Sequence, residues 1–180
     1  MDRMETIKGL KRTNYCGELR IEDAGKEVTL FGWCQRQRDL GNLIFIDLRD
    51  RTGLVQLSFN DTTDREVFAK AQSVRAEYVV AAVGTVCERE SKTNKIATGD
   101  IEINVKEFRI ISKAETPPFE IAKSEKVGDE TTLKYRYLNL RNEKLTQNIL
   151  MRHKIAKIAR EYFYDNDFIE IETPMMIKST

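Results

Sequence analysis

The feature that most constrains the fold is a succession of short apolar runs between Glu27 and Ser112, each bounded by turn residues. Val, Ile, Leu and Phe recur inside these runs with the alternation of a half-buried β-strand. Tight turns are indicated around Gly41 and Gly53, because glycine takes positive φ angles at little cost. The pattern predicts five strands, near residues 27–38, 42–49, 53–59, 77–88 and 100–111.

One segment between the third and fourth predicted strands has the period of a helix. Asp64 is suited to cap its start, and Val67, Phe68 and Ala71 fall on one face before Val74. Five strands with a helix after the third is the order of an OB-fold, a small barrel whose second and third strands form its usual nucleic-acid face. We therefore predict a mainly β chain with an OB-fold barrel over residues 1–112.

The stretch after the barrel has a different composition. Pro117 and Pro118 open a polar segment, and we predict a linker over residues 113–132. From Glu143 to Asp167 the apolar residues form a broad helical stripe, as expected of a helix with two packing partners. Residues 133–180 are then the start of a second domain, and we expect the chain to be the amino-terminal piece of a larger protein.

Charge and cysteine content exclude several classes of protein. Thirty basic and 29 acidic residues give a net charge of +1, so any nucleic-acid contact must come from local clusters. The cysteines Cys16, Cys34 and Cys87 form no CxxC pair, which argues against zinc or redox chemistry and for reduced thiols. No signal peptide or membrane span is visible, and we expect a soluble cytoplasmic protein without a metal site.

The second and third predicted strands each carry a side chain suited to an unpaired base. If the aliphatic residues around them point inward, Phe45 and Gln56 point outward. A phenylalanine ring can stack on a base, and a glutamine amide can pair with a base edge. A single outward phenylalanine is also common on ordinary protein surfaces. The combination of the two on adjacent strands favours binding of single-stranded nucleic acid.

Arginines supply the matching positive charge. Arg36 and Arg38 share one side of the first strand, but a bend or bulge at Gly32 would leave parity unable to assign that side. Arg75 and Arg89, which follow the helix and the fourth strand, are further candidates for the same surface. The alternative is a solvated strand edge that guards against aggregation. No catalytic residue is predicted.

Three separated segments resemble one enzyme family. Residues Gly32 to Gln56 resemble the anticodon-binding domain of bacterial-type aspartyl-tRNA synthetases, and Leu133 to Arg141 resembles the signature that enters their catalytic domain. Phe168 to Pro174 resembles motif 1 of class II aminoacyl-tRNA synthetases. The resemblance runs from Tyr15 onward and implies that residues 133–180 begin an α+β catalytic domain. The sequence departs from the commonest family pattern at Gln37, where a basic residue is usual, and at Asn139, where aspartate is.

The resemblance also implies roles for named residues. Phe45 would stack on an anticodon base, and Gln56 would help to recognise the central uridine. Arg36, Arg38 and Arg89 would contact the first anticodon base or the backbone. The basic residue usual at position 37 suggests that Gln37 weakens a phosphate contact.

Motif 1 in this family builds a homodimer interface from a long helix and a following strand. The resemblance therefore implies a strand from Phe168 to Pro174, and a dimer interface that includes Ile149, Phe163 and Pro174. The apolar stripe of the predicted helix is compatible with that partner.

The implied activity is that of an aspartate-tRNA ligase, which activates aspartate with ATP and Mg²⁺ and transfers it to tRNA. We expect the residues present to bind tRNA but not to form aspartyl-tRNA, because the family's ATP-binding motifs come later in the chain. Lysyl- and asparaginyl-type synthetases share the barrel and motif 1, and a stand-alone OB-fold module would explain the barrel equally well. Whether the full enzyme also charges the asparagine tRNA is not decided by these residues.

Overall fold

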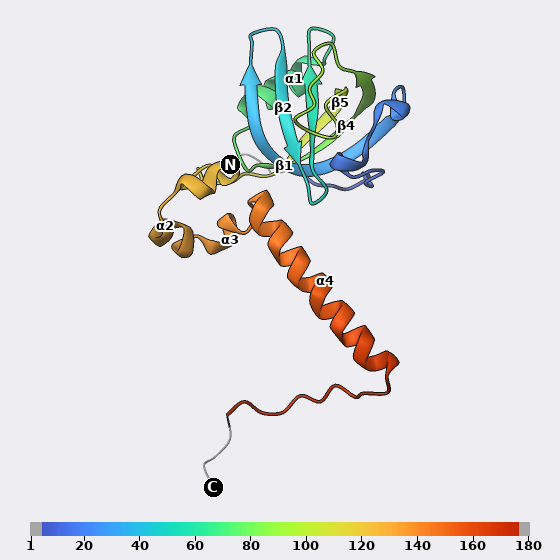
Figure 1. Ribbon diagram of the computed structural model, residues 1–180. Helices are drawn as coiled ribbons and strands as arrows, with labels where there is room; N and C mark the ends of the chain where they lie inside the picture. Colours follow the sequence, from blue (N-terminus) through green and yellow to red (C-terminus); the bar gives the residue numbers. More distant parts are fainter. Residues whose placement is uncertain (1–4, 177–180) are drawn as a thin grey trace. The chain divides into compact units, whose positions relative to one another are not determined.

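A computed structural model describes residues 5–176 of the chain. Its first part contains the five predicted strands and the predicted helix, which are confirmed with shifts of one or two residues at their ends (Figure 1). The bounds are β1 (Glu27–Asp39), β2 (Ile44–Arg49), β3 (Leu54–Phe59), α1 (Arg65–Ser73), β4 (Val79–Glu88), β5 (Ile101–Ser112), α2 (Asp129–Lys134), α3 (Arg136–Asn139) and α4 (Glu143–Asp165), with short 3-10 helices at Cys16–Glu18, Ile21–Asp23 and Ile121–Lys126.

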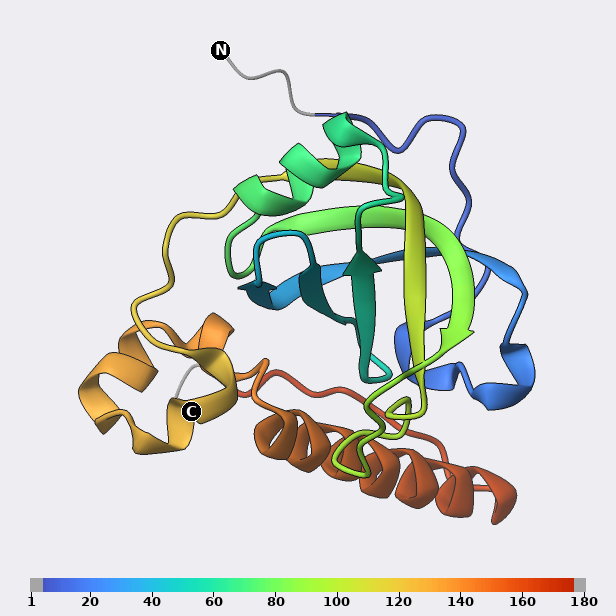
Figure 2. The same cartoon turned by 90° about the horizontal axis from the view of Figure 1, so that it is seen from above.

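The strands form a closed barrel in the order β1-β2-β3-β5-β4. All neighbouring strands are antiparallel except β3 and β5, which pair in parallel and bring Gln56 opposite Glu102. Helix α1 lies across one end of the barrel, against β5 and β2 (Figure 2). The predicted OB-fold is therefore present.

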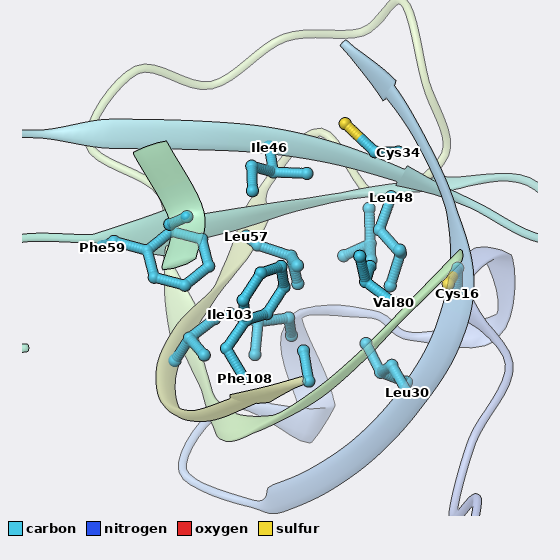
Figure 3. Packing of buried hydrophobic residues seen from close by; sticks show 14 of the residues in the cluster. Cys16, Leu30, Cys34, Ile46, Leu48, Leu57, Phe59, Val80, Ile103 and Phe108 are labelled. Atoms are coloured by element: carbon cyan, nitrogen blue, oxygen red, sulfur yellow. The ribbon is translucent and has the colours of Figure 1, made fainter. Parts of the chain in front are cut away.

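Alternation on β2 contributes one row of the barrel core. Ile44, Ile46 and Leu48 are fully buried, and their neighbours on β2 are only half-buried. Phe59 and Phe108 meet edge to face, with ring centroids 5.1 Å apart (Figure 3). Burying a side chain of this size stabilises the fold by about 1.5–3 kcal/mol. The barrel core is therefore apolar, and polar and aromatic residues occupy the outer face of β2 and β3.

Helix α1 is positioned by both of its ends. The carboxylate of Asp64 accepts hydrogen bonds from the backbone N–H groups of Glu66 and Val67, as predicted for a cap. Val67 and Phe68 pack against the barrel core. At the other end, the Gln37 side chain donates to the carbonyls of Ala71 and Gln72. The Gln37 side chain thus binds the C-terminal end of α1, away from a phosphate contact on the outer face.

Strand β1 contains one irregularity, and it is not at Gly32. The register shifts between Cys34 and Arg36, where β1 has one more residue than β2. Gly32 has a different role: a Cβ there would lie 2.4 Å from the carbonyl oxygen of Arg49, so the close approach of β1 and β2 requires glycine.

The chain divides into two compact units, Met1–Pro117 and Pro118–Thr180. In the second unit, part of the predicted linker is helical, because the 3-10 helix Ile121–Lys126 and α2 begin within it. Phe119, Ile121 and Leu138 form a small buried cluster there.

The predicted long helix is present as α4. Its N-terminus is capped by the side chain of Asn142, which accepts from the N–H of Lys144. The strand predicted from Phe168 to Pro174 is wrong for this structure, because these residues form no ladder with any described segment. A strand is stabilised by pairing with a neighbour, and an isolated extended segment lacks those hydrogen bonds. No helix within residues 5–176 is long and apolar enough to span a membrane.

Candidate nucleic-acid interface

Phe45 lies on the outer face of β2, as the alternation predicted. It is half-buried, between two inward residues that are fully buried. Its cross-strand partner on β1 is Arg38, whose guanidinium carbon lies 5.6 Å from the ring centroid. A guanidinium at that distance over an aromatic face is attracted to the ring. The ring and this cation therefore form one unit on the outer face.

Gln56 also points away from the core, but it is covered. Only 3% of its surface is exposed, and the side chains of Arg38, Arg89 and Glu102 contact it. Its Oε1 accepts hydrogen bonds from Arg38, at 3.0 Å, and from Arg89. Its Nε2 donates to a carboxylate oxygen of Glu102 at 2.7 Å. Both ends of the amide are therefore hydrogen-bonded within the protein.

Arg38 is the centre of this cluster. Its Nη2 lies 2.8 Å from Oδ1 of Asp47, in an ion pair that is about one-third exposed. Screening by water makes the contribution of such a pair small, about 1 kcal/mol or less. Its Nε is buried and has no hydrogen-bond partner in the described part of the chain. Arg38 thus connects Phe45, Asp47 and Gln56 through a single guanidinium.

Arg36 is placed near this cluster by the irregularity in β1. It pairs with Asp47 and not with an inward residue of β2, so it shares the outer face with Arg38. Its side chain is exposed, and no hydrogen bond or ion pair with residues 5–176 engages it. It is available to an anionic ligand.

Arg75 does not join the predicted set. Its guanidinium donates to the backbone carbonyls of Gln72 and Val74, at the C-terminus of α1. A cation there satisfies carbonyls that the helix leaves unpaired and interacts favourably with the helix dipole. The structure therefore brings together Phe45, Gln56, Arg38 and Arg89, adds Arg36 beside them, and places Arg75 at the end of a helix.

Two acidic residues of the cluster were not among the predicted site residues. Asp47 lies beside Phe45 on the outer face of β2, and its ion pair with Arg38 runs diagonally, because the register pairs Asp47 with Arg36. Glu102 reaches Gln56 because β5 closes the barrel beside β3. A parallel pairing between strands so far apart in sequence leaves no local signal, although the alternation of β5 does place Glu102 outside.

The residues predicted for a dimer interface lie in the second unit and are exposed. Ile149 and Phe163 are 45% and 51% exposed on α4, and Pro174 is exposed in the segment after it. Phe163 packs edge to face on Phe168, with ring centroids 5.5 Å apart.

The groups gathered on the outer face of the barrel are suited to binding a ligand. No group of three or more His, Cys, Asp or Glu side chains in the described part of the chain is arranged to hold a metal ion. The outer face of the barrel offers a ring for stacking, an amide with a fixed orientation, and guanidinium groups for phosphates or base edges.

Comparison with known proteins places both units. Residues 28–111 match the family model of the OB-fold nucleic acid binding domain, and residues 128–180 match that of class II tRNA synthetases (D, K and N).

Two relatives are similar over 98% of the chain, each at 52% identity. They are the aspartate-tRNA ligase of Ruminiclostridium cellulolyticum and the aspartate-tRNA(Asp/Asn) ligase of Caldanaerobacter subterraneus. The chain spans 30% of the length of each. Among solved structures, the aspartyl-tRNA synthetase of Entamoeba histolytica superimposes with a TM-score of 0.84 at 27% identity, over 93% of this chain and 40% of that one. With an OB-fold domain followed by a class II segment, and with these homologues, the chain belongs to the class II tRNA synthetases of the D, K and N type.

Proposed function

We propose that this chain provides the tRNA anticodon-binding domain and the first segment of the catalytic domain of an aspartate-tRNA ligase. The observation that carries the proposal is the cluster on the outer face of β1, β2 and β3, where Phe45, Arg38 and Gln56 lie together. The similarity to aspartate-tRNA ligases over 98% of the chain supports the same assignment.

The cluster suggests how an anticodon would be read. Phe45 stacks on one splayed base, and Arg36 engages a phosphate or base edge from its exposed position. Gln56 meets the central uridine only after its acceptor is released, because both Arg38 and Arg89 donate to it in the free protein. We infer that these two arginines turn toward the RNA on binding, so that one rearrangement supplies cations to the ligand and exposes the amide.

The whole enzyme would activate aspartate with ATP and Mg²⁺ and transfer it to tRNA in the cytoplasm. The described residues do not fit a Mg²⁺ site, since no three His, Cys, Asp or Glu side chains among them are grouped to hold a metal ion. No step of that reaction is assigned to them. The exposed apolar residues Ile149 and Phe163 are consistent with a homodimer of the whole enzyme. A second candidate, charging of the asparagine tRNA as well, is favoured by the name of the Caldanaerobacter relative.

Binding to anticodon stem-loops tests the proposal. The 180-residue chain is titrated with loops of the aspartate, asparagine and lysine tRNAs at two salt concentrations, alongside Phe45→Ala and Gln56→Ala. Tighter binding of the aspartate loop, weakened by both substitutions, is the expected result. Equal binding of all loops that falls steeply with salt and ignores both substitutions would reduce the surface to an electrostatic one. Equal binding of the aspartate and asparagine loops alone would favour the second candidate.

A further inference from the structure

The face on which Arg36 and Arg38 lie depends on one extra residue in β1. Val28, Leu30 and Cys34 point into the barrel and are buried. Continuing that alternation would turn Arg36 and Arg38 inward as well. Instead, the register shift between Cys34 and Arg36 inserts Gln35 as an unpaired residue.

The shift changes the cross-strand partners of both arginines. Arg36 pairs with Asp47 and Arg38 with Phe45, and both partners face outward. In a regular register that keeps Gln35 and pairs it with Asp47, the two arginines would lie opposite the inward residues Ile46 and Ile44. The bulge therefore decides whether the proposed nucleic-acid face contains these arginines.

Burial of side chains favours the bulged register only weakly over the regular one at this end of β1. Gln37 occupies the inward position opposite Ile46, and it is only half-buried because β1 reaches the rim of the barrel here. An arginine at that position would keep its charged end near solvent, so turning it inward would cost little. Other interactions must hold the bulge.

An ion pair beside the bulge supplies such an interaction. Nη2 of Arg49 lies 2.9 and 2.8 Å from the two carboxylate oxygens of Glu77, and the two side chains are 14% and 8% exposed. Nη1 of the same guanidinium donates to Oε1 of the bulged residue, Gln35, at 3.3 Å. The guanidinium thus joins Glu77 to the bulge.

The backbone around Glu77 is hydrogen-bonded to Cys34, the residue of β1 directly before the bulge. Its N–H donates to the carbonyl of Cys34 at 2.7 Å, and the N–H of Cys34 donates to the carbonyl of Tyr78 at 2.9 Å. Glu77 has a φ of 65°, a left-handed conformation that residues with a side chain seldom adopt. In this conformation, the backbone N–H of Glu77 contacts β1 beside the bulge, and its carboxylate binds Arg49.

We propose that Arg49 and Glu77 form a register clamp: they are positioning residues that hold Gln35 in the bulge and thereby keep Arg36 and Arg38 on the nucleic-acid face. The effect on RNA binding rests on the proposed function, whereas the effect on register does not. Neither clamp residue needs to touch the ligand.

Deleting Gln35 provides a direct test, because the deletion makes the bulge unnecessary. Without Gln35, a regular ladder pairs Arg36 with Asp47 and Arg38 with Phe45. The full chain is prepared as Glu77→Ala, as the Gln35 deletion and as both together. Glu27→Ala is the matched control, since it removes a carboxylate from the exposed ion pair with Lys106 elsewhere on the barrel.

Two readouts are compared. Cross-strand nuclear Overhauser contacts between Arg38 and Phe45 report the register without RNA, and titration with the aspartate anticodon stem-loop reports binding. We expect Glu77→Ala to lose those contacts and to bind about tenfold more weakly, while the deletion and the control stay within about threefold of the parent. The double variant should regain both the contacts and the affinity.

Retention of the Arg38–Phe45 contacts and of affinity in Glu77→Ala would overturn the clamp. A double variant as weak as Glu77→Ala would also overturn it, because a general loss of stability is not repaired by the deletion. If Glu77→Ala does not fold, Glu77→Gln, which keeps one acceptor, takes its place in the same series. If the parent chain binds no stem-loop, the proposed function fails, and the nuclear Overhauser contacts still decide the clamp.

Discussion

The side-chain nitrogen of Gln56 lies 2.7 Å from a carboxylate oxygen of Glu102, across the parallel pairing of β3 and β5. A carboxylate accepts hydrogen bonds and cannot donate them, so this contact determines which end of the amide is which. The oxygen of Gln56 is thereby turned toward Arg38 and Arg89. Closure of the barrel thus orients the group proposed to read the central anticodon base.

Replacing Glu102 with glutamine should loosen that orientation. A neutral glutamine at position 102 replaces a charge-assisted hydrogen bond with a weaker one, so the Gln56 amide is held mainly by Arg38 and Arg89, which donate to its oxygen. We expect affinity for the aspartate stem-loop to fall about fivefold, as for loss of one charge-assisted hydrogen bond. The side-chain amide signals of Gln56 in a ¹H–¹⁵N spectrum should shift. Glu90→Gln, at an exposed position next to Arg89 after the end of β4, is the control, and equal effects of the two substitutions would contradict the role of Glu102.

Removing the ring of Phe45 should weaken binding with little effect on the fold. Stacking on one base contributes about 1–3 kcal/mol, so Phe45→Ala is expected to bind at least about fivefold more weakly. Phe45→Tyr keeps a stacking surface and should stay close to the parent. Leu40→Ala removes an exposed apolar side chain from the adjacent loop and serves as the control. Titration with the aspartate stem-loop measures all three, and a Tyr variant as weak as the Ala variant would argue against stacking.

The main features of the barrel could be predicted because its strands alternate regularly. The inward set on β2 and the outward position of Phe45 follow from period alone. The face of Arg36 and Arg38 does not, because the bulge at Gln35 depends on contacts with a turn more than 40 residues away. The burial of Gln56 was also missed, since it arises from long side chains on strands that meet only when the barrel closes.

The strand predicted after α4 shows another limit of local patterns. Phe168 to Pro174 has the composition of a strand, but strand formation requires a neighbour with which to pair. None of the described segments is that neighbour, and the residues stay without a ladder. Likewise, the short helices within residues 113–132 are stabilised by a small cluster around Ile121 and Leu138, which composition did not reveal.

The stability of the barrel should depend on the ionisation of Asp50. Burial acts to raise its pKa, but hydrogen bonds from the backbone of Cys16 and from Thr52 outweigh this and hold the pKa below its usual 3.8. The folded-state pKa is depressed, so the ion stabilises the fold above the unfolded-state pKa. That contribution is lost as the pH falls below about 4 and through the folded-state pKa.

Asp50→Asn should therefore unfold more easily than the parent at neutral pH, by about 1 kcal/mol, and lose less stability on acidification. Urea unfolding at a series of pH values measures both effects. Asp61→Asn, in the exposed turn before α1, is the control. Parallel stability curves for the parent and Asp50→Asn would contradict a role for Asp50.

Thiol reactivity should separate the three cysteines. Burial, followed by the nearby charges of Asp47 and Glu77, raises the pKa of Cys34 to about 12, and burial with Asp50 raises the pKa of Cys16. Because the thiolate is the reactive form, iodoacetamide near pH 8 should modify half-buried Cys87 first in the native protein. Cys16 and Cys34 should react only after denaturation. Mass spectrometry assigns the sites, and early modification of Cys34 in the native protein would show that β1 opens beside the bulge.

We propose that the outer face of β1, β2 and β3 reads an anticodon base and does more than attract a polyanion. The most direct measurement is the ratio of dissociation constants for the aspartate stem-loop and for the same loop with its central uridine replaced by cytidine, in the parent and in Gln56→Ala. We expect a ratio of about tenfold or more in the parent, as for one mismatched contact, and a ratio near one in Gln56→Ala. A ratio near one in the parent, or the same large ratio in both proteins, would contradict it.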